Sequence, residues 1–423
     1  MSKIKLSELG SLKNGLNFNS GNIIYGGCKI IGIPDFADRY IADLRCLSEV
    51  DSAIVNEDYL LRKDDILFVR SNGNKALVGR TMIIGEVKER ITYSGFCIRF
   101  RPDKDKVLPL FLLYLFKSPQ FRKQFSKSQQ TSINNLNQDT LGSIIFDLPD
   151  IHTQEMIVKC IHSITQKIET NKAVNDNLQQ QLKLLYDYWF TQFDFPDENG
   201  KPYCSSGGAM VWNEQLNSNI PQNWKVGTVS DCVDKISTGL NPRDNFVLGN
   251  GDIRYITVKN LTATGSLDFS GCDTIDEDAR AIVHKRSDIS VGDILFASIA
   301  PLGRCYFIQQ APADWDINES VFSIRSKTDT ITPEFMYLYF KSENFIQKAT
   351  NTSTGSIFKG IRINTLLNTA LIVPEFQVCK SFTDTVKPLF AEINNNSSET
   401  AKLTALRDWL LPMLMNGQAT ISD

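Results

Sequence analysis

The sequence predicts an α+β fold in which a pair of long, antiparallel coiled-coil helices separates two tandem domains. Three observations predict this fold: two stretches with coiled-coil spacing, a long internal repeat, and a polar segment between the two copies. We expect domains at residues 1–150 and 225–375, long helices at 151–193 and 376–423, and a linker at 194–224.

The first long helix is indicated by apolar residues at alternating gaps of four and three, the spacing of a and d positions in a coiled coil. These residues are Ile157, Ile161, Ile164, Ile168, Leu178, Leu182, Leu185 and Trp189. Asn171 and Asn175 fill the two central positions, and neither Gly nor Pro interrupts the stretch. A helix of this length spans about 48 Å and needs a partner to cover its apolar side.

The partner helix is predicted in the second half of the chain, where the same spacing returns. Its apolar positions are Phe382, Val386, Leu389, Ile393, Leu403, Leu410 and Leu414. Asn396 and Thr400 lie at its centre, so an antiparallel pair would place Asn175 near Asn396 and Asn171 near Thr400. Pro388 predicts a kink or a later helix start. The alternative is that each helix packs only on its own domain.

Short motifs recur at offsets of 224 to 228 residues, which indicates a tandem duplication. The repeated pairs are Gly15-Leu16-Asn17 with Gly239-Leu240-Asn241, Asp65 to Phe68 with Asp293 to Phe296, Gly79-Arg80 with Gly303-Arg304, Phe111 to Ser118 with Phe335 to Ser342, and Leu148-Pro149 with Val373-Pro374. Each copy therefore contains the same elements in the same order.

Within each copy, short β-rich runs are followed by a helix, a polar loop and one more strand. In the first copy the expected strands are 29–33, 66–70, 81–84 and 96–100, and the helix starts at Pro109. In the second copy Thr332-Pro333-Glu334 predicts a helix start, with Thr332 as the cap.

Composition narrows the class of protein. The chain has 423 residues, a net charge of -3 and nine Cys without a C-x-x-C pair, so neither a zinc ribbon nor a disulfide framework is indicated. The first residues lack an apolar signal region, and no apolar run is long enough to span a bilayer. We expect a cytoplasmic protein with reduced thiols and no membrane partner. Residues 101–130 are locally basic, which fits either a solvated surface or phosphate contacts.

Two segments carry a family resemblance: LLYDYWFTQFDFPDENGKPY from Leu184 and GGAMVWN from Gly207. Together with the tandem domains and long helices, they resemble the specificity subunit of type I restriction-modification systems. The resemblance covers the whole chain. It departs from the family pattern where Phe376-Gln377, instead of Glu-Gln, opens the second long helix, whereas the first helix has Gln154-Glu155.

The resemblance implies a non-catalytic subunit with two target recognition domains related by a pseudo-two-fold axis. Each domain would read one half of a bipartite, asymmetric site in double-stranded DNA, and the helices would fix the gap. Two methyltransferase subunits and, in the nuclease, restriction subunits would dock on the chain. S-adenosylmethionine, ATP and Mg²⁺ would belong to those partners, and none of them to this chain.

Catalytic motifs are missing from the sequence. It contains neither an Asn/Asp-Pro-Pro-aromatic motif for a flipped adenine nor a P-loop, and His152, His162 and His284 lack metal-ligand spacing. We therefore expect neither catalytic residues nor a metal site. The alternative is a stand-alone metal-dependent nuclease using Asp35, Glu86 and Lys88. The second copy has Lys259-Asn260 in place of Pro34-Asp35.

Candidate DNA-binding residues fall in three places in each copy, because Arg and Lys contact guanine or phosphate and Asn and Gln pair with adenine. Such residues are also ordinary in turns. In the first copy they are Lys13, Asn14 and Asn17 in the early turn, Arg70, Ser71, Asn72, Asn74, Lys75 and Arg80 after the Asp-Ile-Leu-Phe strand, and Gln129, Gln130, Thr131, Ser132, Asn134 and Asn135 after the helix. In the second copy they are Thr238, Asn241 and Arg243, then Ser298 and Arg304, then Thr352, Ser353, Thr354, Ser356, Lys359 and Arg362.

Overall fold

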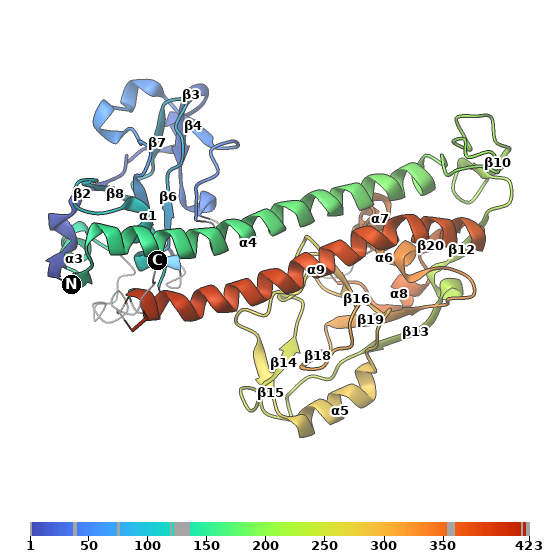
Figure 1. Cartoon of the computed structure of the whole chain (residues 1–423). Helices are drawn as coiled ribbons and strands as arrows, with labels where there is room; N and C mark the ends of the chain where they lie inside the picture. Colours follow the sequence, from blue (N-terminus) through green and yellow to red (C-terminus); the bar gives the residue numbers. More distant parts are fainter. Residues whose placement is uncertain are drawn as a thin grey trace. The chain divides into compact units, whose positions relative to one another are not determined.

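The computed structural model describes residues 2–36, 40–73, 77–118, 121, 136–352, 360–415 and 418–419. The chain divides into two compact units. Unit 1 comprises Met1–Thr170 with Glu399–Asp423, and unit 2 comprises Asn171–Ser398. Each unit therefore combines one β-rich domain with part of both long helices (Figure 1). None of the described helices has the length and apolar character needed to cross a membrane.

The domain of unit 1 contains three small sheets among its described residues. The largest is antiparallel, with the strand order β2-β8-β5-β6, and the second has the order β4-β3-β7, in which β3 runs parallel to β7. The third pairs β1 with β9. The strands are β1 Ser2–Lys5, β2 Gly10–Asn14, β3 Ile23–Ile31, β4 Ser48–Val50, β5 Ile66–Val69, β6 Thr81–Ile83, β7 Ile91–Tyr93, β8 Cys97–Pro102 and β9 Ile145–Leu148.

Two short helices cover the large sheet of unit 1. They are α1 Pro109–Lys117 and α3 Gln138–Gly142, and the start of α1 at Pro109 confirms the prediction. Phe116 of α1 packs against Phe68 and Phe100 of the sheet, with ring centroids 5.0 and 6.3 Å apart. Single turns complete the unit: η1 Leu6–Glu8, η2 Ser20–Asn22, η3 Ile33–Asp35, η4 Ser52–Ile54 and η5 Glu57–Tyr59.

The domain of unit 2 has the same three sheets with the same strand order. The corresponding orders are β13-β19-β16-β17, β15-β14-β18 and β12-β20, and β14 again runs parallel to β18. The strands are β12 Lys225–Thr228, β13 Val233–Thr238, β14 Ile253–Ile256, β15 Asp273–Ile275, β16 Ile294–Ala297, β17 Cys305–Phe307, β18 Trp315–Ile317, β19 Val321–Ser326 and β20 Ala370–Val373. The duplication predicted from sequence motifs is therefore present in the fold.

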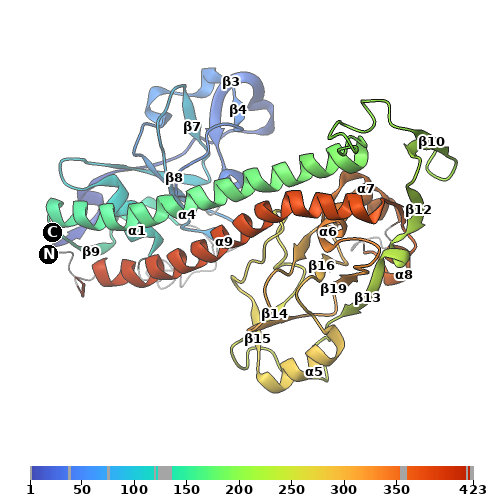
Figure 2. The same ribbon diagram turned by 45° about the vertical axis from the view of Figure 1, so that its right-hand side comes forward.

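The helices of unit 2 are α5 Glu277–Ser287, α6 Pro333–Lys341, α7 Glu343–Thr352 and α8 Ile363–Leu367, with the turn η8 at Val229–Cys232. Helix α6 starts at Pro333 as predicted, but Thr332 caps it differently. The Thr332 hydroxyl is buried without a hydrogen-bond partner, and its backbone carbonyl accepts from Met336 N at 3.2 Å. Helix α5 lies beside β14 and β15 within unit 2 (Figure 2).

A buried ion pair repeats in the two large sheets and explains the Asp of the Asp-Ile-Leu-Phe motif. In unit 1 the Arg101 Nε and Nη2 atoms both donate to Asp65 at 2.7 Å. In unit 2 the Arg325 Nε and Nη2 atoms donate to Asp293 at 2.7 and 2.8 Å. Asp65 and Asp293 are each 1% exposed. The carboxylate raises the pKa of each arginine. Each pair thus anchors the strand that precedes a candidate DNA-binding loop.

The long helices are α4 Ile151–Tyr186, which continues as the π-helical η7 Asp187–Thr191, and α9 Phe376–Met415. The later start predicted from Pro388 is wrong, because the backbone N–H groups of Val378 and Cys379 already donate to Glu375 O. In unit 1, Ile157 and Ile161 of α4 share a core with Leu411 and Leu414 of α9.

In unit 2 the same two helices pack in antiparallel fashion. The ring centroids of Trp189 and Phe382 lie 5.3 Å apart. Asn396 Nδ2 donates to Asn175 Oδ1 at 3.0 Å. The Asn175 amide also donates to Ile393 O at 3.2 Å. The predicted contact between Asn175 and Asn396 is therefore confirmed. Asn396 is buried and Asn175 is half-buried, and a polar pair between two long helices can fix their register.

Residues 194–224, predicted as a linker, fold onto unit 2. They contain the hairpin β10 Met210–Asn213 and β11 Ser218–Pro221. Phe195 stacks on Trp224 with ring centroids 5.0 Å apart, and both side chains belong to the core of unit 2. This segment is ordered by aromatic packing in addition to connecting two elements.

Candidate nucleic-acid interface

In unit 1, two of the three predicted DNA-binding places lie side by side around one hollow. Asn17 of the early turn and Arg70 and Ser71 after β5 all line it, and its volume is about 450 Å³. The described residues that line it are Leu16, Asn17, Phe18, Asn19, Ser20, Ile23, Arg70, Ser71, Ser94, Gly95 and Phe96. Arg70 is the only ionisable residue among them.

Backbone hydrogen bonds hold the hollow in shape. Arg70 N donates to Phe96 O at 2.7 Å, and the Arg70 Nη1 atom donates to Gly95 O at 3.2 Å. Leu136, which follows the third predicted loop, donates its N–H to Arg70 O at 2.8 Å. Leu136 is therefore held beside Arg70.

Gly95 lies where the early turn approaches closely. A Cβ atom at this position would lie 2.1 Å from Asn17 Oδ1, and Gly95 N donates to Leu16 O at 2.7 Å. The turn after β7 and the turn after β2 thus pack against each other, and a larger residue at position 95 would require the Asn17 side chain to move.

The other described candidates of unit 1 have contacts within the domain. Lys13 lies 3.3 Å from Asp58 and 4.4 Å above the Tyr59 ring. Arg80 and Asn72 are half-buried, and Asn14 ends β2. The predicted residues Asn74, Lys75, Gln129, Gln130, Thr131, Ser132, Asn134 and Asn135 lie outside the described residues.

In unit 2, several predicted residues are occupied by contacts inside the domain. The hydroxyls of Thr238 and Ser298, which are 8% and 7% exposed, donate to Gly239 O at 3.1 Å and Ser320 O at 2.7 Å. Arg304 Nη1 donates to Leu261 O at 3.1 Å. These contacts give the three side chains structural roles in the free chain.

Three predicted residues of unit 2 reach the surface. Asn241 is half-buried, Arg243 is exposed, and Arg362 is exposed at the N-terminal cap of α8. The side chain of Thr352 and the residues Ser353, Thr354, Ser356 and Lys359 lie outside the described part of the chain.

Equivalent backbone contacts frame the candidate loops of both units. Ile361 N donates to Ser298 O at 2.8 Å, as Leu136 N does to Arg70 O. Ser298 N donates to Ser320 O, as Arg70 N does to Phe96 O. The backbone is thus alike where the side chains differ.

Comparison with known proteins identifies the family. The model of the type I restriction modification DNA specificity domain matches residues 1–180 and 221–404. The chain belongs to this family of specificity subunits. It is therefore the non-catalytic subunit of a type I restriction-modification system.

Individual relatives agree with this assignment. The chain is 24% identical to the type I restriction enzyme MjaIX specificity subunit of Methanocaldococcus jannaschii, over 76% of this chain and 71% of that protein. It is 22% identical to the HindI specificity subunit of Haemophilus influenzae, over 85% of this chain and 87% of the relative. The fold resembles the crystal structure of the type I restriction-modification S subunit from M. genitalium, with a TM-score of 0.55, 15% identity, and 98% and 95% of the two chains covered.

The nuclease alternative gains no support for this specificity subunit. The Asp35 carboxylate accepts from Gly32 N at 2.7 Å, which closes a turn. Glu86 pairs with Lys63, whose ammonium group lowers the pKa of the Glu86 carboxyl. No group of three or more His, Cys, Asp and Glu residues is placed to hold a metal ion within the described ranges.

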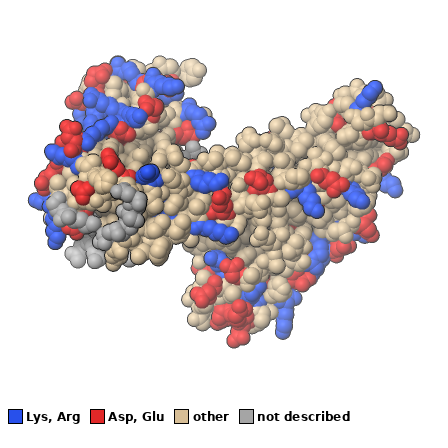
Figure 3. Space-filling model, in the orientation of Figure 1, with Lys and Arg blue, Asp and Glu red and all other residues tan. Residues whose placement is uncertain are grey.

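Charge differs between the two domains of the specificity subunit. Residues 1–150 carry 21 Lys and Arg against 17 Asp and Glu, a net charge of +4, whereas residues 225–375 carry 15 against 18, a net charge of -3. Basic side chains gather on the visible face of the first domain, interspersed with acidic ones (Figure 3). In the basic stretch that begins at Arg101, Lys104 pairs with Asp64 and Lys106 with Asp103, so these lysines are partly neutralised.

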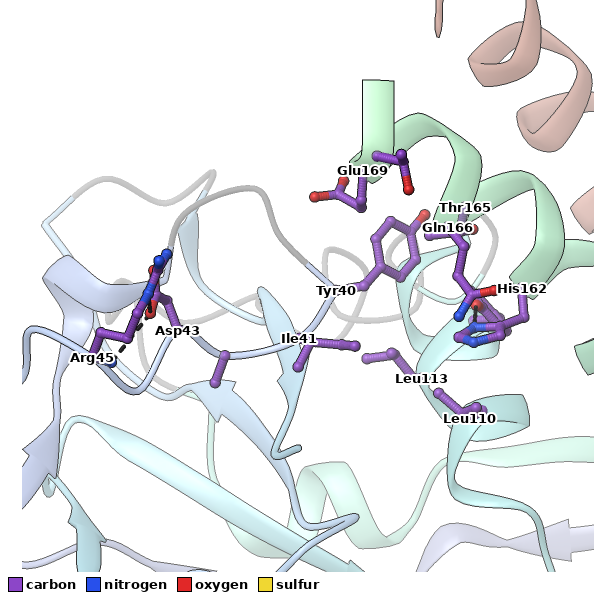
Figure 4. A pocket seen from close by; sticks show the side chains of 13 residues that line it. Tyr40, Ile41, Asp43, Arg45, Leu110, Leu113, His162, Thr165, Gln166 and Glu169 are labelled. Atoms are coloured by element: carbon purple, nitrogen blue, oxygen red, sulfur yellow. Dashed lines mark hydrogen bonds and ion pairs between the residues drawn. The ribbon is translucent and has the colours of Figure 1, made fainter. Parts of the chain in front are cut away.

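A larger hollow of about 650 Å³ lies elsewhere in unit 1, between residues 40–45, α1 and α4 (Figure 4). Tyr114 and His162 meet there, with Oη and Nδ1 2.9 Å apart, and burial raises the pKa of Tyr114 to about 12. Asp43 and Glu169 also line it. Arg45 also lines it and pairs with Asp43 at 2.8 Å, so the hollow has one arginine and two carboxylates.

Sequence reasoning missed Phe96 as a surface residue, because it lies beside a strand with mostly buried residues. Its side chain is 59% exposed and lines the hollow beside Arg70. Comparison of the two copies would have indicated it. The residue equivalent to Phe96, immediately before β19 in the second copy, is Ser320, which is not aromatic. An aromatic residue that the duplicated core does not require is a candidate for binding.

Proposed function

We propose that this specificity subunit reads a bipartite, asymmetric DNA site, with one domain on each half and the helices α4 and α9 setting the gap. The observation that carries this proposal is the same scaffold present twice with different side chains at the equivalent loops. Equal scaffolds dock on DNA in equal ways, and different loop residues read different bases.

We further propose that the subunit acts in an assembly with two methyltransferase subunits and with restriction subunits. Family membership and the names of the relatives, which are subunits of restriction enzymes, support this proposal. S-adenosylmethionine would be bound by the methyltransferase partners, and ATP and Mg²⁺ by the restriction partners. Because the target is double-stranded DNA, the assembly works in the cytoplasm.

Methylation mapping tests the proposed function. Genomic adenine methylation is mapped in the source cells with the gene intact, deleted, and restored on a plasmid. We expect one split motif with two unlike halves to disappear on deletion and to return on complementation. A methylation pattern that does not respond to the gene would contradict the proposal.

The spacing role of the helices has a separate test. One heptad is inserted in α4 between Thr170 and Asn171 and another in α9 between Ser398 and Glu399. A heptad keeps the a and d positions facing the partner and lengthens the helix pair by about 10 Å. That length equals roughly three base pairs, so we expect both half-sites to be retained with a gap longer by that amount.

The control for this experiment inserts the heptad in α4 alone. The apolar positions of the two helices then no longer match, and we expect loss of methylation instead of a new gap. Retention of the original gap after the paired insertion would exclude the spacer role while leaving DNA recognition intact.

A further inference from the structure

The turn that carries Phe96 is held rigidly although its side chain lies in solvent. Two hydrogen bonds to Ser94 fix the backbone of this turn. Phe96 N donates to Ser94 Oγ at 3.3 Å, and Cys97 N donates to Ser94 O at 2.8 Å. Arg70 N holds Phe96 O at 2.7 Å. The backbone that carries the ring is therefore held in place while the ring itself is outside the core, and an exposed aromatic side chain at such a position is a candidate contact residue.

The Arg70 guanidinium keeps donors for a ligand. Among the described residues its side chain makes one hydrogen bond, from Nη1 to Gly95 O. A guanidinium has five N–H donors, and two in parallel match the O6 and N7 acceptors of guanine. Arg70 lines the same hollow as Phe96, so one ligand can contact both.

The charge of the hollow fits DNA. None of the described residues that line it is acidic, and the polar ones besides Arg70 are amides and hydroxyls: Asn17, Asn19, Ser20, Ser71 and Ser94. The larger hollow of unit 1 differs, because two carboxylates, Asp43 and Glu169, line it together with Arg45. The smaller hollow is thus the better match for base edges flanked by phosphates.

The second domain has different chemistry at the equivalent place. Ser298 takes the position of Arg70, and Asn318-Glu319-Ser320 takes that of Ser94-Gly95-Phe96. Glu319 is exposed. A carboxylate accepts from the N4 amino group of cytosine, whereas Arg donates to guanine, so the two turns cannot read the same base pattern in the same orientation.

We infer that Arg70 and Phe96 form a specificity-determining pair of the first domain, with Arg70 contacting a guanine edge and Phe96 the methyl group of an adjacent thymine. This inference rests on the proposed function, since it assumes that the first domain reads one half of the site. It assigns a G-T neighbour pair to that half and gives the second half no equivalent reader.

The inference is tested in the full complex of this chain with the methyltransferase subunits of its own system, expressed in a host without adenine methylation. Wild type, Arg70→Lys, Arg70→Ala and Phe96→Ala are compared by mapping methylated sites. Arg70→Lys retains the charge but loses the planar fork. We expect it to relax discrimination at one guanine by about tenfold, with every position of the other half unchanged.

Phe96→Ala is expected to relax the neighbouring thymine position alone. The matched control is Phe269→Ala, which removes a partly exposed aromatic ring (39%) from the second domain and should leave the first half of the motif unchanged. Thermal unfolding of each variant shows whether it folds. If Arg70→Ala does not fold, Arg70→Lys provides the same readout with the charge kept.

Two outcomes would overturn the inference. One is a motif that is unchanged in Arg70→Lys and in Phe96→Ala, and the other is a loss of methylation spread evenly over all positions of both halves. Failure of the proposed function looks different. In that case the wild-type complex itself yields no split motif, and the variants have no pattern to alter.

Discussion

The domains of units 1 and 2 share one scaffold but not one surface. Both have the strand orders, the single parallel pair and the buried Asp–Arg pair described above. They differ in net charge, in helix α5, which replaces the turns η4 and η5 of unit 1, and in the turn that carries Phe96. Core packing and buried hydrogen bonds constrain the first set of features, while the loops are free to change. A duplicated domain can therefore change its loop side chains without a change of fold.

The largest effect is expected where the two long helices enter the two cores. Ile157 in unit 1 and Phe382 in unit 2 are equivalent positions, 2% and 0% exposed. Phe382→Ala should destabilise unit 2 by about 4 kcal/mol, and Ile157→Ala should destabilise unit 1 by about 3 kcal/mol, because each leaves a cavity. Hydrogen exchange measured separately for each unit checks this. Equal loss of protection in both units after either change would mean that the units do not unfold separately.

The buried ion pairs should respond unequally. Asp65→Ala leaves the Arg101 guanidinium with Leu60 O at 3.0 Å as its remaining acceptor among the described residues. In unit 2, Arg325 keeps both Asp288 O at 2.7 Å and the Asp288 carboxylate at 3.4 Å. We expect a loss of about 3 kcal/mol for Asp65→Ala and about 2 kcal/mol for Asp293→Ala, measured by denaturant unfolding. A larger loss for Asp293→Ala would contradict the role of Asp288.

A smaller effect is expected for the polar contact between the helices. Asn396→Ala removes the donor to Asn175 Oδ1, while Asn175 Nδ2 keeps its contacts with Ile393 O and Ser397 Oγ, so the cost should be about 1 kcal/mol. Replacing both Asn175 and Asn396 with Leu should restore stability but permit more than one pairing of the helices. Cross-linking of cysteine pairs along α4 and α9 detects this. A single register in the double variant would show that the polar pair is dispensable.

The duplication and the Asn175–Asn396 contact were predictable because motif order and heptad spacing are local patterns that a sequence displays directly. The Asp65–Arg101 pair was not predictable, since Arg101 is distant in sequence and belongs to a run of basic residues that also fits phosphate binding. The exposure of Phe96 was not predictable for a related reason. Its neighbours are buried strand residues, and only the fold shows that a turn exposes its ring. Thr332 has a capping residue's position but not its hydrogen bond, because burial and geometry decide the contact.

The core of unit 1 contains Leu411, Leu414 and Met415 from the last turns of α9. A ribosome makes these residues only after the whole of unit 2 has been synthesised. Until then the apolar side of Ile157 and Ile161 has no permanent cover, so the domain that emerges first is the one completed last. Nascent chains that stop before α9 should thus be captured by chaperones or degraded, which would keep incomplete readers away from the genome.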